Sequence, residues 1–199
     1  MTTIILPPAK VSVSENFSSG GSSSSLGSNW NNFIQGGGTL GVVLGRAAST
    51  GSTDGRKSSL HVSRMRSENH FVQATCGTSP NASIRAGIIG RADESFAEWI
   101  ALIVSSGNSI LIRGSGLVSW EDANVTVLAT WASFAVFNVI RLEFRDDVIQ
   151  GFKDGVSLGT YSATRPYAIG PTCRRVGLQV SRGSSINSGN LDDFSAGDL

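Results

Sequence analysis

The sequence predicts an all-β fold, a single antiparallel β-sandwich of the jelly-roll type. Apolar and polar residues alternate with a period of two along much of the chain, the pattern of half-buried strands. Polar and glycine-containing turns separate these stretches at intervals of about 8–12 residues, which is typical of sandwiches and barrels. The length of 199 residues suits one large sandwich.

The expected strands occupy residues 38–45, 61–67, 70–77, 83–91, 98–106, 108–116, 124–131, 138–145, 148–153, 156–162, 174–182 and 190–196. Within 138–145, Ile140, Leu142 and Phe144 share one face, and charged residues occupy the other. Residues 98–106 are apolar on both faces, which predicts a central strand covered on both sides.

Loops and turns separate these strands. Residues 18–25 are rich in serine and glycine and predict a loop, as do residues 49–59. Asp154-Gly155 is a strong two-residue hairpin signal, because glycine takes positive φ without penalty. With a second turn at Asp146-Asp147, residues 138–162 form a three-stranded meander. Residues 92–99 have room for one helical turn.

The first residues predict an extended arm rather than part of the sandwich. Pro7 and Pro8 exclude a helix in this segment and disfavour a central strand. We therefore divide the chain into an arm, residues 1–13, and a sandwich, residues 14–199. The arm residues expected to anchor on a neighbouring subunit are Ile4, Ile5, Leu6, Pro7 and Pro8.

The charge pattern argues against several classes of partner. The formal net charge is +1 and no basic stripe is present, so nucleic-acid binding is not expected. The pairs Arg64/Arg66 and Arg174/Arg175 are interpreted as solvated strand residues. No apolar run reaches the roughly 18 residues of a membrane helix. The first residues lack the features of a signal peptide, which predicts synthesis in a cytosol.

Cysteines and acidic residues give no sign of a cofactor. Cys76 and Cys173 are expected to be reduced thiols on separate strands, because a cytosolic protein seldom forms disulfides. Calcium stays open, since aspartates on loops supply its oxygen ligands, but no D-x-D-x-D string is present. The candidate aspartates are Asp54, Asp93, Asp122 and Asp146. No metal site or cofactor is predicted.

Catalysis is not expected either. The sequence has no H-E-x-x-H, no G-x-S-x-G and no Cys/His cluster. Glycan hydrolysis in a sandwich needs two converging carboxylates. Glu94 and Glu98 precede a buried strand and are expected to face solvent, whereas Asp192 and Asp193 are adjacent and point to opposite faces. Neither set makes a catalytic pair, so the prediction is a protein that is not an enzyme.

One tryptophan is a candidate for sugar binding. Trp99 and Trp131 lie in apolar strands and are expected in the core, and Trp30 is expected to plug the start of the domain. Trp120 lies in a loop-like stretch with Asp122 and Asn124 close by. An exposed aromatic ring with polar neighbours is the arrangement of a carbohydrate site. The candidate carbohydrate-binding residues are Trp120, Asp122 and Asn124.

Three stretches resemble a known family. They are SENFSSGGSSSSLGSNW at 14–30, NVIRLEFRDDVIQGFKDGVSLGTYSA at 138–163, and RVGLQVSRGSSINSGNLDDFSAGDL at 175–199. Their order resembles the concanavalin A-like (laminin-G-like) jelly roll found in bacteriophage virion proteins, especially minor tail proteins. The paired acids of the family's enzymes and the calcium loop of legume-type lectins are missing from the sequence.

The resemblance implies a non-enzymatic structural or binding module of a bacteriophage virion, most often in the tail. Capsid decoration and a freestanding carbohydrate-binding, lectin-like domain are the alternatives. The expected partners are other virion proteins, further copies of the chain, and a host cell-surface glycan. In such jelly rolls the first and last strands are often neighbours, which predicts that Phe17 and Phe194 both point into the core.

Overall fold

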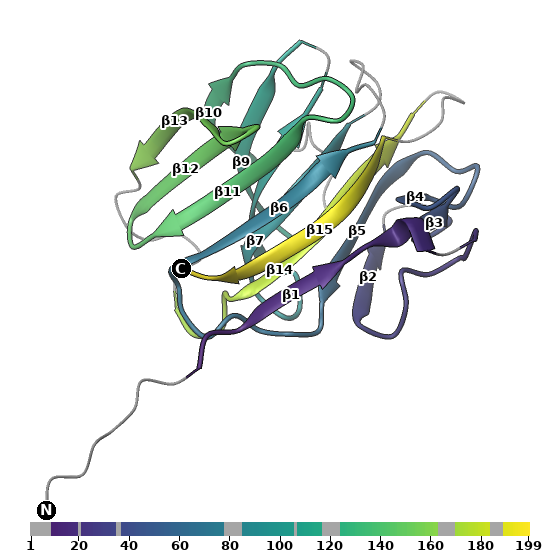
Figure 1. Cartoon of the computed structure of the whole chain (residues 1–199), viewed down its shortest axis with the longest axis horizontal. Helices are drawn as coiled ribbons and strands as arrows, with labels where there is room; N and C mark the ends of the chain where they lie inside the picture. Colours follow the sequence, from purple (N-terminus) through teal and green to yellow (C-terminus); the bar gives the residue numbers. More distant parts are fainter. Residues whose placement is uncertain are drawn as a thin grey trace, which may run out of the picture.

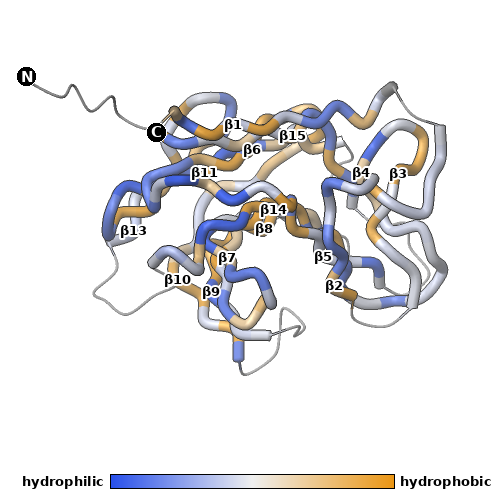
Figure 2. The backbone as a smooth tube through the Cα atoms, turned by 90° about the horizontal axis from the view of Figure 1, so that it is seen from below, coloured by the Kyte–Doolittle hydropathy of each residue, from blue (hydrophilic) through white to orange (hydrophobic). Residues whose placement is uncertain are grey.

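The protein is an antiparallel sandwich of two β-sheets, as the computed structural model shows (Figures 1 and 2). The structure describes residues 9–19, 21–34, 37–77, 85–105, 107–116, 124–162, 170–183 and 189–199. The helical structure in these residues is one 3-10 turn, Phe17–Ser19. The prediction of an all-β jelly roll is therefore confirmed.

The eight-stranded sheet, here sheet A, has the order β13-β12-β11-β6-β15-β4-β3, and β1 pairs with β15. Its strands are β1 Ser12–Glu15, β3 Leu40–Val43, β4 Arg46–Ser49, β6 His70–Cys76, β11 Val139–Arg145, β12 Val148–Lys153, β13 Val156–Ser162 and β15 Asn190–Asp198. The predicted meander is β11-β12-β13, and its second turn has φ of 50° at Asp154 and 78° at Gly155.

The seven-stranded sheet, here sheet B, has the order β10-β9-β8-β7-β14-β5-β2. Its strands are β2 Trp30–Ile34, β5 Gly55–His61, β7 Ala86–Ala92, β8 Glu98–Val104, β9 Ser109–Ser115, β10 Val125–Trp131 and β14 Arg175–Arg182. Every residue of β8 after Glu98 is buried, which confirms the prediction of a strand covered on both faces.

The first and last strands lie side by side, as predicted. Ser12 to Glu15 pair with Gly197 to Phe194 (Figure 1). Phe17 and Phe194 are both buried, and both rings pack against Trp30, at 6.2 and 5.0 Å between centroids. Because β1 begins at Ser12, the last two residues assigned to the arm belong to the sandwich.

Two local predictions are wrong. The stretch expected to be a loop, 49–59, contains most of β5, and the strand expected at 61–67 is a connecting segment between β5 and β6. The reason is that β5 buries polar side chains that find partners. Lys57 Nζ donates to the carbonyls of Thr53, Asp54 and Gly55 at 3.0–3.3 Å.

The other segments agree more closely. The range 92–99 holds a turn, closed by the bond from the Phe96 amide to the Asp93 carbonyl, instead of a helix. Cys76 and Cys173 are free and buried, as expected for reduced thiols. Burial raises the pKa of the Cys76 thiol to about 12, so this sulfur stays protonated and unreactive.

Candidate functional site

The outer face of sheet B carries a second apolar cluster, separate from the core between the sheets. Its members alternate along the strands with residues that face sheet A. Each is 2% exposed or less: Leu60, Ile89, Ala92, Phe96, Trp99, Ala101, Ile103 and Ile112. This face of the sheet is therefore packed with apolar side chains and closed to water at these positions.

Stacked rings and a buried arginine tie distant strands together across this face. Phe96 stacks on Phe33 of β2 at 5.0 Å and on Trp99 of β8 at 5.5 Å. The Arg56 guanidinium of β5 lies 4.6 Å from the Trp99 ring. Since β5 and β8 are separated by β14 and β7, these contacts require sheet B to be strongly curled.

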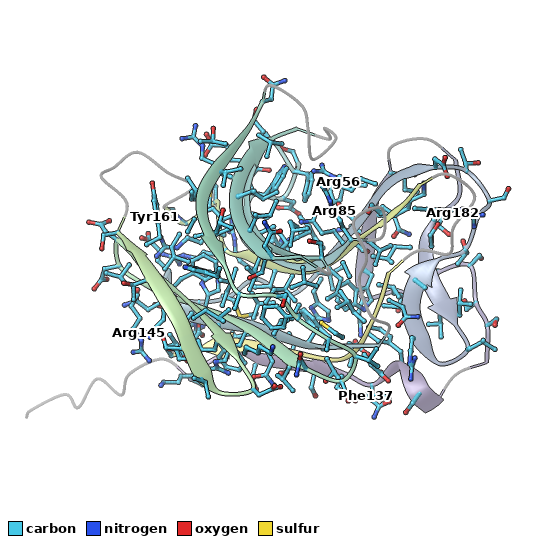
Figure 3. All side chains as sticks on the ribbon, turned by 90° about the horizontal axis from the view of Figure 1, so that it is seen from above. Arg56, Arg85, Phe137, Arg145, Tyr161 and Arg182 are labelled. Carbon is cyan, nitrogen blue, oxygen red and sulfur yellow. The ribbon has the colours of Figure 1, made fainter. Side chains whose placement is uncertain are left out.

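The carbonyl of Gly116 is a shared acceptor at the end of this stack. Trp99 Nε1 donates to it at 2.9 Å and Arg56 Nη2 at 3.4 Å. Burial lowers the pKa of Arg56 to about 10, which still leaves it charged at neutral pH. Figure 3 shows Arg56 inside the molecule and Arg145 at the rim. The fully buried Trp99 has no ring face available to a sugar, which agrees with the prediction that it is a core residue.

Sheet B is poor in acidic residues. Its seven strands contain one, Glu98, at the exposed start of β8. Glu94 is 67% exposed and pairs with Arg175 at 3.0 Å. Two carboxylates facing each other across a substrate are needed for glycan hydrolysis, and the strands of this sheet do not supply them.

A polar pocket of about 530 Å³ opens at the end of the sandwich where β1 begins and β15 ends. Its walls come from segments that are far apart in the sequence. They are Lys10, Arg66, Ser67, Glu68, Asn69, Asp146, Arg174, Asp198 and Leu199.

One arginine of each pair interpreted as strand residues, Arg66 and Arg174, lines this pocket. Apart from Arg175, the residues of both pairs lie in connecting segments, so the strand assignment is wrong. Arg174 Nη1 donates to the Arg66 carbonyl at 2.6 Å, and the Met65 amide donates to the Arg174 carbonyl at 3.0 Å. Sequence patterns could not bring the two pairs together, because 108 residues separate Arg66 from Arg174.

The predicted carbohydrate-binding residues are largely untested. Trp120 and Asp122 lie outside the described residues, as do the anchor residues of the arm: Ile4, Ile5, Leu6, Pro7 and Pro8. Asn124 is described and is exposed just before β10. Its neighbour Val125 pairs with Gly114, below the Trp99 ring.

Metal ligands do not gather in the described residues. Within them, no group of three or more His, Cys, Asp or Glu side chains could hold an ion. Of the aspartates considered for calcium, Asp93 accepts instead from the amides of Ala97 and Glu98, at 2.8 and 3.2 Å. In the same described residues, no helix is long and apolar enough to cross a membrane.

Comparison with known proteins places the chain at the level of fold. No protein-family model matches the sequence, and no curated protein matches it. Among solved structures, the chain is similar to SCLam, a non-specific endo-β-1,3(4)-glucanase of family GH16, with a TM-score of 0.61 and 10% identity over 98% of this chain and 93% of that one.

Two similar structures are binding domains. The carbohydrate-binding module CBM66 from Bacillus subtilis has a TM-score of 0.55 and 12% identity, covering 85% of this chain and 92% of that one. The carbohydrate recognition domain of Emp46p has a TM-score of 0.56 and 10% identity, covering 86% and 88%. The fold is thus the concanavalin A-like jelly roll, which carries both glycan-binding and glycan-cleaving proteins.

Proposed function

We propose that the chain is a non-enzymatic structural and binding module of a bacteriophage particle. The proposed location is the phage tail, and a capsid decoration protein is the alternative. The observation that carries the non-enzymatic part is the composition of sheet B, whose seven strands hold a single acid, Glu98. The virion part is supported by the resemblance of residues 14–30, 138–163 and 175–199 to phage members of the family.

A freestanding carbohydrate-binding domain is the second candidate. It is favoured by the likeness to CBM66 and to the Emp46p recognition domain, and by the polar pocket beside Lys10. For this second candidate the ligand is a host-surface glycan, and Trp120, Asp122 and Asn124 stay the residues proposed to bind it.

Contact with further copies or other virion proteins is supported by the uncharged edge strands on one side of the sandwich. Sheet A ends in β13 and sheet B in β10, and these two edge strands lie beside each other. Neither strand contains a charged residue, and Val127 and Val156 are 57% and 71% exposed. Charged side chains are one of the devices by which soluble monomers protect such edges.

The absence of catalysis is tested on soluble β-glucans and agarose. We expect no release of reducing ends by the full chain. Turnover that disappears in Glu98→Gln would overturn the proposal. A glycan array with arabinogalactan and peptidoglycan fragments, probed with wild type and Trp120→Ala, separates the candidates. Binding that is lost in the variant would favour the lectin-like domain.

Assembly is tested by deleting residues 1–8, which leaves β1 intact. Light scattering should show an oligomer for the full chain and single sandwiches for the deletion, with unchanged circular dichroism. Val156→Lys should weaken self-association, and Val62→Lys, beside β2 at the end of sheet B opposite β10, is the matched control. An equal mass for the full chain and the deletion would contradict the role of the arm.

A further inference from the structure

One exposed aromatic ring lies at a backbone position that usually takes glycine. Phe137, just before β11, has φ of 66° and is 69% exposed at the edge of the molecule (Figure 3). A bulky residue rarely adopts positive φ, because its Cβ crowds the following carbonyl. Phe96 has a similar φ of 62°, but its ring is buried and stacks on Phe33 and Trp99. Packing therefore explains the conformation of Phe96 and does not explain that of Phe137.

A β-bulge produces the conformation of Phe137. Its amide donates to the Cys76 carbonyl at 2.7 Å, and the Cys76 amide donates to the Asn138 carbonyl at 2.9 Å, so two residues lie opposite one. In one common type of bulge the first residue is a glycine with positive φ. Bulges and strained residues are frequent beside functional sites, where they redirect a side chain. Here the bulge holds a phenylalanine ring in solvent.

Polar groups fix this bulge from the side of the β12–β13 hairpin. Asn138 Nδ2 donates to Asp154 Oδ2 at 2.7 Å, and the Ala135 amide donates to Asn138 Oδ1 at 2.6 Å. Asp154 Oδ1 accepts from the Val139 amide at 2.7 Å. A carboxylate has about four acceptor positions, so these bonds leave acceptor capacity on the exposed Asp154. The ring is thus held rigidly, with a carboxylate bonded to the residue that follows it.

We propose that Phe137 is a stacking platform for a neutral pyranose ring of a glycan, and that Asp154 accepts hydrogen bonds from its hydroxyl groups. One face of such a ring presents C–H groups that pack on an aromatic face, and the hydroxyl groups at its edge need polar partners. The core of a protein interface is depleted in charge, so the nearby carboxylate favours a sugar over a protein. The negative charge of Asp154 also disfavours acidic sugars.

The inference rests on the glycan-binding candidate proposed above and adds Phe137 to the residues named there. Its test is an NMR titration of the full chain with cellotetraose, a β-linked galactotetraose and tetragalacturonate. We expect saturable binding of a neutral tetraose, with shifts at the Phe137 and Asn138 amides, and weaker binding of the acidic one.

Variants assign the binding to the ring. Phe137→Ala should lower the affinity by at least about tenfold, and Phe137→Tyr, which keeps an aromatic face, should retain it. Phe137→Gly places the usual residue in the bulge, so it should keep the wild-type circular dichroism and lose binding. Leu44→Ala is the matched control, because Leu44 is also apolar, 88% exposed and at positive φ, in the β3–β4 hairpin.

Several results would overturn the inference. They are no binding of either neutral tetraose, equal affinity in Phe137→Ala, an equal loss in Leu44→Ala, and tighter binding of tetragalacturonate than of the neutral probes. A lower mass of Phe137→Ala in light scattering would make the ring a subunit contact and also overturn it. Binding on the glycan array that is lost in Trp120→Ala but kept in Phe137→Ala would reject Phe137 and leave the lectin-like candidate standing.

Discussion

At the scale of single residues, the sandwich buries charge only where the charge has acceptors. Lys57 is fully buried, yet its ammonium group reaches three main-chain carbonyls. Arg56 is buried against aromatic rings and shares the Gly116 carbonyl with Trp99. Burying a charge without such partners would cost several kcal/mol, so each of these residues fixes the segment that supplies its acceptor.

The first prediction concerns Phe194 and Phe17, which join the two ends of the chain. Phe194→Ala should lower the free energy of unfolding by about 3–5 kcal/mol, because a ring buried against Trp30 and His61 leaves a cavity. Phe17→Ala should have a similar effect. Chemical denaturation measures both losses.

A surface variant serves as the control for these two. Phe137 is 69% exposed, so Phe137→Ala should change the free energy of unfolding by less than about 0.5 kcal/mol. A loss below about 1 kcal/mol in both core variants would show that the ends of the chain contribute little to the core.

At the scale of elements, the turn at Asp154 reverses the chain and also bonds to the start of another strand. Asp154 occupies the hairpin between β12 and β13 with positive φ, which its short polar side chain tolerates. Its carboxylate also accepts from the Val139 amide and from Asn138 Nδ2, both at 2.7 Å. The turn thereby holds the start of β11, the first strand of the meander.

The second prediction follows from this double role. Asp154→Ala should destabilise the protein by about 1–3 kcal/mol, since it removes two charge-assisted hydrogen bonds and places alanine at positive φ. Asp154→Asn keeps the turn geometry and one acceptor and should lose less. Thermal unfolding of the two variants compares them, and equal losses would mean that only the charge matters.

At the scale of the whole molecule, the two sheets are closed on one side by Trp131. This ring reaches from β10 onto sheet A, where it lies over Gly151 and Gly159. A Cβ atom at either glycine would come within 2.3 and 2.9 Å of the ring. The sandwich therefore depends on small residues in one sheet opposite a large residue from the other.

The third prediction is a loss of stability in mild acid. His70 is fully buried, and desolvation lowers its pKa to about 4, with Arg91 adding to the effect and Asp198 opposing it. In the unfolded chain its pKa is about 6.5. Between these values the unfolded chain binds a proton that the folded chain does not. The free energy of unfolding therefore decreases as the pH is lowered, by up to about 1.4 kcal/mol per pH unit.

Denaturant titrations between pH 7 and pH 4.5 measure this slope. His70→Gln should flatten it, with a remainder from His61, whose pKa is also lowered by burial. Burial opposes the lowering of the Glu143 pKa, and hydrogen bonds from Arg141 and Arg145 outweigh it, so this residue contributes mainly at and below the acid end of this window. A wild-type protein equally stable at pH 7 and pH 4.5 would contradict the role of His70.

The sequence by itself determined the strand pattern and the outline of the sandwich. The period of two, the Asp154-Gly155 turn and the apolar stretch around Trp99 depend on local alternation and turn chemistry, and these act between near neighbours. They predicted the meander and the doubly covered β8. The pairing of the chain ends that buries Phe17 and Phe194 was expected from the resemblance to the jelly-roll family.

Only the tertiary structure decided the position of β5, the closed outer face of sheet B and the polar pocket. The strand β5 is polar, and it is stable because partners such as the Gln179 side chain come from other strands. The pocket gathers Lys10, Arg66 and Arg174 from distant segments. Such convergence depends on how the sheets pair and curl, which no short stretch of sequence encodes.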